Sequence, residues 1–212
     1  MIAFGDILKV KILKKSNERI EFEVEGLTPG LAGELRRIML SEIPTMAIEW
    51  VDFHKNDSII WDEIIASRLG LIPLVFNSKL YGMKDECKCD GKGCSRCQVM
   101  LALKKKGPCM VYSEDLKSSD KEVKPIYGKI PIVELMDNQE LEFEATAELG
   151  LGKVHAKWQG AVVGYEASPK KDKYTFIVET ACGLSAEDVV KKSFEVLQEK
   201  LKDFGTDVAR LK

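Results

Sequence analysis

The sequence predicts an α+β fold, and three observations carry this prediction. Several segments alternate apolar and charged residues with a period of two, which is typical of half-buried strands. Two longer segments carry apolar residues at three- and four-residue spacings behind a capping residue, which is typical of amphipathic helices. The chain has 212 residues, of which 45% are hydrophobic, and this is enough to bury a core.

The first elements are a hairpin and a helix. Residues 7–13 and 20–24 alternate apolar and charged side chains, so we expect two paired strands there. Thr28 is the expected N-cap of the helix and Pro29 its first residue, because Pro loses no hydrogen bond at that position. The helix is expected to end near Glu42, since the residue before the next proline disfavours helical conformation.

The middle of the chain is expected to be mainly β. The apolar segment 45–53 predicts a strand covered on both faces, and Asp62 is expected to cap a short helix through Leu69 with Gly70 as its left-handed stop. Residues 84–98 predict a loop, because they hold four cysteines and few apolar side chains. Further strands are expected at 99–103, 109–112, 141–149, 161–165 and 173–179, with a polar connection at 166–172.

The last helix is expected to begin at Ala186 behind the N-cap Ser185 and to end near Phe204, before Gly205. Its apolar residues recur at alternating steps of four and three, which is the spacing of a heptad seam. They are Val190, Phe194, Leu197, Leu201 and Phe204. Periodicity alone favours a partner helix and the chain's own sheet equally as the surface that this seam contacts.

The loop at 84–98 contains Cys87, Cys89, Cys94 and Cys97, spaced as C-x-C and C-x-x-C. Four thiolates complete a tetrahedral zinc shell with no open position, which is a structural site. An iron–sulfur cluster is the alternative, but the C-x-C pair suits a single ion better than the usual ferredoxin spacing does. The two remaining cysteines, Cys109 and Cys182, are interpreted as packed apolar residues.

Composition argues against several function classes. Lys and Arg (32) nearly balance Asp and Glu (34), whereas proteins that hold a phosphate backbone usually carry a basic excess. The run Lys104–Lys106 is interpreted as a solvated strand end. The sequence shows neither a signal peptide nor a stretch long enough to span a membrane, so we expect a cytoplasmic protein. No catalytic motif is found, and we expect no catalytic residues.

Four blocks resemble one known family. They are residues 35–49 (LRRIMLSEIPTMAIE), 62–74 (DEIIASRLGLIPL), 111–116 (VYSEDL) and 155–159 (HAKWQ), in that order along the chain. This pattern resembles the family that comprises the D-type subunit of archaeal DNA-directed RNA polymerase, the third-largest subunit of eukaryotic polymerase II and the bacterial alpha subunit. The cysteine loop is similar to the zinc loop of the eukaryotic subunit, whereas an archaeal source is expected because no nuclear-type tail follows Lys212.

The resemblance implies a non-catalytic assembly subunit of a DNA-directed RNA polymerase. Residues 1–44 and 160–212 would form a dimerisation domain, and residues 45–159 would be a mainly β insertion that carries the cysteine loop. The expected partners are a smaller subunit of the L type, the second-largest catalytic subunit and small polymerase subunits, with little or no DNA contact. Only the connection at 166–172 occupies the place where many archaeal relatives insert a ferredoxin-like domain.

The same resemblance assigns roles to two sets of residues. The dimer interface is expected at Leu31, Leu35, Ile38, Met39, Val190, Phe194, Leu197 and Leu201. Arg36 and Arg37 match the family pair that docks the second-largest subunit. A free redox or metal-handling module, or a stand-alone nucleic-acid binder, would be the rival functions; the first leaves the Arg-Arg helix unexplained and the second is opposed by the charge balance.

Overall fold

The computed structural model describes residues 8–168 and 173–210, and it confirms the α+β class. The chain divides into two compact units: residues 1–43 with 151–212, called the split unit here, and residues 44–150, called the inserted unit. The sequence analysis expects the inserted unit to end at Gln159, whereas the compact unit in the structure ends at Gly150. The following turn belongs to the split unit, because the amide of Lys153 donates to Ser41 O and that of Gly160 to Leu40 O.

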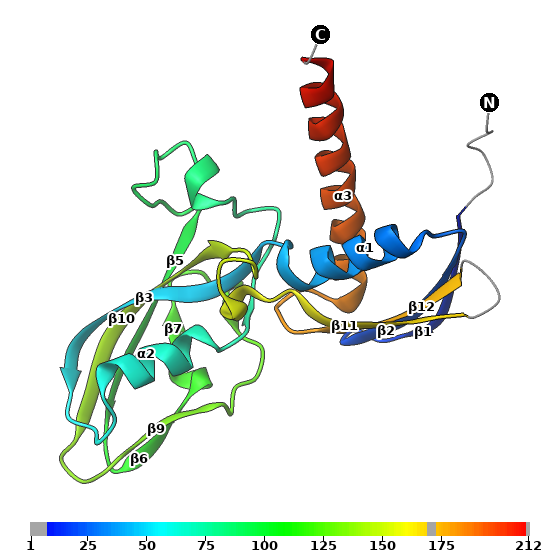
Figure 1. Ribbon diagram of the computed structural model, residues 1–212. Helices are drawn as coiled ribbons and strands as arrows, with labels where there is room; N and C mark the ends of the chain where they lie inside the picture. Colours follow the sequence, from blue (N-terminus) through cyan, green and yellow to red (C-terminus); the bar gives the residue numbers. More distant parts are fainter. Residues whose placement is uncertain (1–7, 169–172, 211–212) are drawn as a thin grey trace, which may run out of the picture. The chain divides into compact units, whose positions relative to one another are not determined.

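The split unit is a four-stranded antiparallel sheet in the order β1-β2-β12-β11, with two helices (Figure 1). Its elements are β1 (Lys9–Lys15), β2 (Arg19–Glu25), α1 (Pro29–Ser41), the 3-10 turn η3 (Ala156–Trp158), β11 (Ala161–Ala167), β12 (Lys173–Thr180) and α3 (Ala186–Ala209). In β2, the apolar residues are buried and the glutamates between them are not, as the alternation predicts. Phe22 stacks on Phe176 of β12 at 5.2 Å, which places the core between the sheet and α1.

Both helices of the split unit begin as the sequence predicts. Thr28 accepts a hydrogen bond from the amide of Leu31, and Ser185 accepts one from the amide of Asp188. The expected end of the last helix is wrong, because α3 continues through Gly205 to Ala209. A single Gly costs a helix only about 1 kcal/mol relative to Ala, which is too little to end it.

The inserted unit contains a second antiparallel sheet in the order β3-β10-β5-β7, with α2 packed on β3 and β9. Its elements are β3 (Thr45–Asn56), α2 (Asp62–Gly70), β4 (Leu74–Val75), η1 (Lys84–Glu86), β5 (Gln98–Lys106), β6 (Cys109–Tyr112), η2 (Ser113–Asp115), β7 (Lys117–Ser118), β8 (Lys124–Pro125), β9 (Pro131–Leu135) and β10 (Glu140–Gly150). Two small ribbons, β4-β8 and β6-β9, complete it.

Three expectations in the inserted unit are wrong. Only Thr45–Ile48 of β3 is covered on both faces, and from Glu49 onward inward and outward residues alternate, with Trp50 exposed. Gly70 is not a left-handed stop, because it is the last helical residue and Leu71 continues in right-handed conformation. Asp62 is likewise not the cap; Trp61 holds that position, and Asp62 accepts a hydrogen bond from Asn56 Nδ2 instead.

The polar connection expected at 166–172 falls partly outside the described residues, which resume at Lys173. Within the described residues, no helix is both long and apolar enough to cross a membrane.

Candidate metal centre and assembly surface

The four loop cysteines converge on one point. The Sγ atoms of Cys87, Cys89, Cys94 and Cys97 all lie within 4.8 Å of one another. The Cys87–Cys94, Cys89–Cys97 and Cys94–Cys97 sulfur pairs are 3.6, 3.7 and 3.8 Å apart. A tetrahedral shell with metal–sulfur bonds of about 2.3 Å separates its sulfur atoms by about 3.8 Å. The structure therefore brings the predicted ligands together at the spacing that a single four-coordinate ion requires.

Left-handed backbone makes this convergence possible. Asp90, Gly91 and Gly93 have φ angles of 51°, 76° and 87°. Glycine has no Cβ to clash in this conformation, so it suits the sharp reversal between the two cysteine pairs. The second pair closes as a tight turn, in which the amide of Cys97 donates to Cys94 O and the amide of Cys94 donates to Cys97 Sγ at 3.2 Å.

The thiols differ in how readily they lose their protons. A hydrogen bond with Cys87 lowers the pKa of the Cys89 thiol to about 7, whereas burial raises the pKa of Cys97 to about 12. Thiolates are the metal-binding form, so an ion held by all four sulfur atoms must displace these protons.

Three basic side chains surround the cysteines. They are Lys88, Lys92 and Arg96, which are exposed around the loop and offset part of the negative charge of four thiolates. A closed shell of this kind is suited to holding structure together and has no position for a substrate.

Sequence reasoning missed the residues that anchor the cysteine loop to the sheet. Lys84 Nζ forms an ion pair with Glu148 Oε2 of β10 at 2.9 Å, and both side chains are mostly buried. The hydroxyl of Tyr81 donates to Asp120, and the amide of Gly82 donates to Arg96 O. Lys84 is close enough to the sulfur atoms for Cys97 and Cys89 to raise its pKa, although Glu148 is the larger cause. Glu148 and Asp120 lie far along the chain from the cysteines, so spacing within the motif gives no signal for them.

The structure places the α1 residues of the predicted dimer interface mainly in the core. Leu35, Ile38 and Met39 are no more than 2% exposed, and Leu31 is half-buried. The first three stabilise the split unit itself and have no surface left with which to contact a partner. The apolar stripe of α1 is therefore explained by the chain's own sheet.

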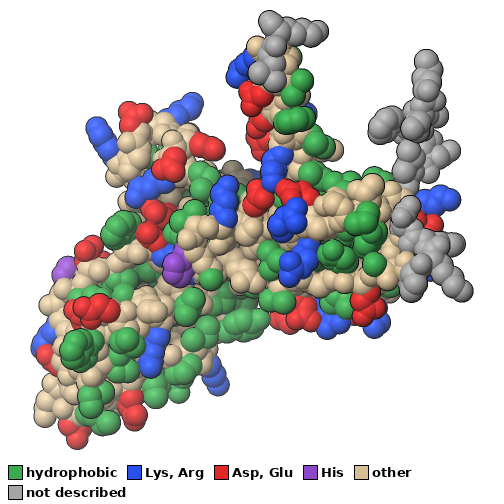
Figure 2. Space-filling model, in the orientation of Figure 1, with side chains coloured by type: hydrophobic (Ala, Val, Ile, Leu, Met, Phe, Trp, Pro, Cys, Tyr) green, Lys and Arg blue, Asp and Glu red, His purple; other side chains and the backbone are tan. Residues whose placement is uncertain are grey.

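The apolar side chains of α3 are more exposed than those of α1. Val190 and Leu197 are half-buried, but Phe194, Leu201, Phe204 and Val208 are 36%, 61%, 68% and 47% exposed. We call these four residues the α3 stripe. Figure 2 shows hydrophobic side chains along one side of this helix. The heptad spacing identifies the first three members, whereas Val208 lies beyond the helix end that the sequence predicts.

A second apolar area of the split unit lies on the edge strand β1. Val10 and Ile12 pair with Val24 and Phe22, so they share the sheet face on which the core is built. They are nevertheless more than half exposed, because the helices pack mainly on β11, β12 and β2. The sequence marks these residues as the inner face of a strand, but it does not show that the chain leaves them uncovered.

The two arginines predicted to dock a large subunit make contacts within the split unit. Arg36 Nε donates to Val163 O of β11 at 2.9 Å, which fastens α1 to the sheet. Arg37 Nε donates to Glu34 Oε2 at 3.1 Å, and its side chain remains 61% exposed. Arg36 therefore has a role in the fold that the sequence analysis did not assign to it.

Comparison with known proteins identifies the family. Residues 51–163 match the family described as RNA polymerase Rpb3/RpoA insert domain. The chain is 48% identical over 169 residues to DNA-directed RNA polymerase subunit Rpo3 of Methanosphaera stadtmanae, covering 77% of this chain and 62% of that protein. It is 45% identical over 160 residues to the same subunit of Pyrococcus horikoshii, covering 76% of this chain and 60% of that protein.

A third relative is matched over almost the whole chain. Rpo3 of Methanosarcina acetivorans is 37% identical over 207 residues, which are 96% of this chain and 76% of that protein. The chain spans about three fifths of the length of the Methanosphaera and Pyrococcus relatives. The resemblance seen in the sequence blocks is confirmed: this chain belongs to the Rpb3/RpoA family of RNA polymerase subunits, with archaeal Rpo3 subunits as its relatives.

Proposed function

We propose that this chain is a non-catalytic assembly subunit of a cytoplasmic DNA-directed RNA polymerase and that it pairs with a smaller subunit of the L type. The split unit is the dimerisation domain in this proposal, and the inserted unit carries the metal loop. The observation that carries the proposal is the α3 stripe, a row of exposed apolar side chains on one helix. Large apolar patches on a soluble protein mark interaction sites, because water solvates them poorly.

The uncovered face of β1 supports the same pairing. The inner face of the sheet continues from the buried Phe22 to the exposed Ile12. A partner helix laid against β1 would extend the core of the split unit over Val10 and Ile12. The proposed interface therefore comprises the α3 stripe with Val10 and Ile12, and it leaves out Leu35, Ile38 and Met39 of α1, which the split unit itself buries.

The larger subunits would dock elsewhere on the chain. Arg37 is the better candidate of the arginine pair for the second-largest catalytic subunit, because its side chain is 61% exposed and bonds to Glu34 of its own helix, whereas Arg36 is held by Val163 O of β11. Direct DNA contact is disfavoured by the charge balance and by the pairing of the basic run. Lys104 Nζ lies 2.7 Å from Glu142 and Lys105 Nζ lies 2.6 Å from Asp115, so neither ammonium is uncompensated.

Zinc is the proposed occupant of the cysteine site. The sulfur separations of 3.6–3.8 Å favour one ion over a cluster, because a cluster places several iron atoms between the four thiolates. In this role the four cysteines hold the ion, and the ion supplies a cross-link that fixes the loop. The closed shell also argues against a free redox module as the function of the chain.

We assign the chemistry of the polymerase to another subunit, because a closed four-cysteine shell has no open position at which a substrate could bind.

Coexpression tests the pairing. The tagged chain alone is expected to self-associate at high concentration, whereas coexpression with an archaeal L-type subunit is expected to give a soluble one-to-one heterodimer on size-exclusion chromatography with light scattering. A monodisperse monomer that does not retain the L-type subunit would refute the proposal.

A further inference from the structure

Helix α3 leaves the core long before it ends. Its buried residues, Ala186, Val189 and Ser193, all lie in its first third, and from Phe194 to Arg210 every described side chain is half-buried or exposed. The α3 stripe thus lies on the part of the helix that has the least support. Packing fixes the base of α3, but a small change of tilt there displaces the far end of a long helix considerably.

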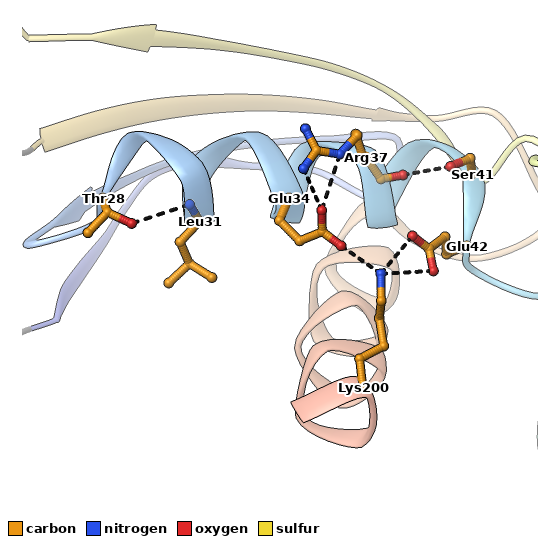
Figure 3. Close-up of polar contacts among 7 residues, drawn as sticks. All are labelled: Thr28, Leu31, Glu34, Arg37, Ser41, Glu42 and Lys200. Atoms are coloured by element: carbon orange, nitrogen blue, oxygen red, sulfur yellow. Dashed lines mark hydrogen bonds and ion pairs between the residues drawn. The ribbon is translucent and has the colours of Figure 1, made fainter. Parts of the chain in front are cut away.

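One ion-pair network supports α3 beyond Ser193. Lys200 Nζ lies 2.6 Å from Glu34 Oε1 and 3.0 Å from Glu42 Oε1, and Glu34 in turn accepts hydrogen bonds from Arg37 (Figure 3). Lys200 is about 10 Å further along the helix axis than Ser193, at a rise of about 1.5 Å per residue. Among the described residues of α3 after Ser193, it is the one with a hydrogen bond or ion pair to another element.

The ion pairs of Lys200 restrict the orientation of α3 more than they stabilise the fold. Ion pairs on a protein surface typically contribute about 0–1 kcal/mol, and Lys200 is 43% exposed. The two glutamates, however, leave the backbone eight residues apart, on and just after α1, which is about 12 Å along a helix axis, and their carboxylates converge on Lys200 Nζ. One ammonium held between them restricts movement of α3 along α1 in both directions. The contact with Lys200 lowers the pKa of Glu34, so the network is charged at neutral pH.

We propose that Lys200 is a positioning residue, which uses Glu34 of α1 and Glu42 at the C-cap of α1 to hold the α3 stripe in the orientation that the smaller subunit docks against. This inference rests on the proposed function. A helix already held in its bound orientation loses less conformational freedom on binding, and affinity increases for that reason.

The first test uses the chain without its partner. Hydrogen–deuterium exchange at micromolar concentration should be several-fold faster in residues 194–210 of Lys200→Met than in the wild type. Met keeps the length and apolar stem of the side chain and removes its charge. The control Lys202→Met, which removes a charge from an exposed residue of the same helix, should leave exchange unchanged. Equal exchange in all three proteins would overturn the inference.

The second test measures affinity for the L-type subunit with purified chains. Lys200→Met is expected to bind about threefold to thirtyfold more weakly, with Lys202→Met unchanged. The double variant Glu34→Gln with Glu42→Gln removes the same ion pairs from the other side, so it should weaken binding about as much as Lys200→Met does, and adding Lys200→Met to it should cause no further loss. If Lys200 instead contacted the partner directly, Lys200→Met would weaken binding further in the double variant and the inference would be wrong.

The two proposals fail in different ways. A wild-type chain that does not bind the L-type subunit would refute the proposed function and this inference together. A wild-type chain that binds, with a Lys200→Met variant that binds equally well, would refute the inference and leave the proposed function standing.

Discussion

Placing carboxylates on the α3 stripe gives the sharpest test of the assembly role. Leu201 is 61% exposed and Phe204 is 68% exposed, so the pair offers a partner a little more than one whole side chain of apolar surface. Covering a Leu or Phe side chain completely is worth about 1.5–3 kcal/mol, so losing both apolar contacts costs about 2–4 kcal/mol. This corresponds to about 30-fold to several-hundredfold in affinity.

Leu201→Asp with Phe204→Asp should have a larger effect than that. Each new carboxylate would be buried without a partner, which costs several kcal/mol more, and the heterodimer should therefore be undetectable at micromolar concentration. The folding stability of the lone chain should change by no more than about 0.5 kcal/mol per site, because both residues already face water. Leu197 is left unchanged, because it is half-buried and its substitution would mix a folding defect with a binding defect.

Isothermal titration with the L-type subunit, alongside thermal melts of each variant, measures both quantities. Thr206→Asp is the matched control, because it adds the same charge to an exposed residue turned about 140° away from Leu201 on the helix. The reasoning is refuted if the double variant retains wild-type affinity while keeping its fold. It is equally refuted if the double variant unfolds while Thr206→Asp does not, since that outcome makes the α3 stripe part of the chain's own core.

Three further predictions concern the metal loop, the arginines and pH. The purified chain should contain about one zinc per molecule without visible absorption from iron and sulfide, and stoichiometric iron would contradict this. Cys94→Ser should disorder the loop but not the sheet. Lys84→Met should speed zinc release to a chelator about 10-fold or more, whereas Lys88→Met should not. Arg36→Ala should lower the melting temperature because it loses the bond to Val163 O, whereas Arg37→Ala should leave it nearly unchanged and reduce incorporation into polymerase; the reverse pattern would contradict this assignment. Lys200 lowers the pKa of Glu34 in the folded chain. The stability that this ion pair contributes is therefore fully present above the unfolded pKa of about 4.3, and it is lost as pH falls through the lower folded pKa. The difference in melting temperature between wild type and Lys200→Met should be constant from about pH 7 to 5 and shrink in more acidic solution.

Local sequence patterns predict the helices and longer strands well, but they do not predict which of their side chains the rest of the chain covers. The alternation in residues 20–24 and the caps Thr28 and Ser185 identify β2, α1 and α3, because those signals depend on neighbouring residues alone. The apolar segment at 45–53 is harder, since coverage of Trp50 depends on strands and helices far along the chain. Short strands such as β4 and β8 have two residues each and carry no periodicity.

The candidate functional residues likewise fall into those that the local sequence predicts and those that depend on tertiary structure. The four cysteines form a motif within one loop, and their convergence follows from spacing. The α1 stripe and the α3 seam have similar periodicity, yet one is buried and the other exposed. Periodicity reports that a helix has an apolar face, but only the tertiary structure shows whether the chain itself covers that face.

The length of α3 beyond Ser193 also bears on how a cell would balance the two subunits. An unsupported helix of this length is only marginally stable in water, so its end opens readily when no partner covers it. Proteases cut backbone that opens in this way, and they would remove unpaired copies faster than paired ones. On the proposed pairing, excess subunit would be cleared by ordinary protein turnover, and matched amounts would accumulate without a dedicated regulator.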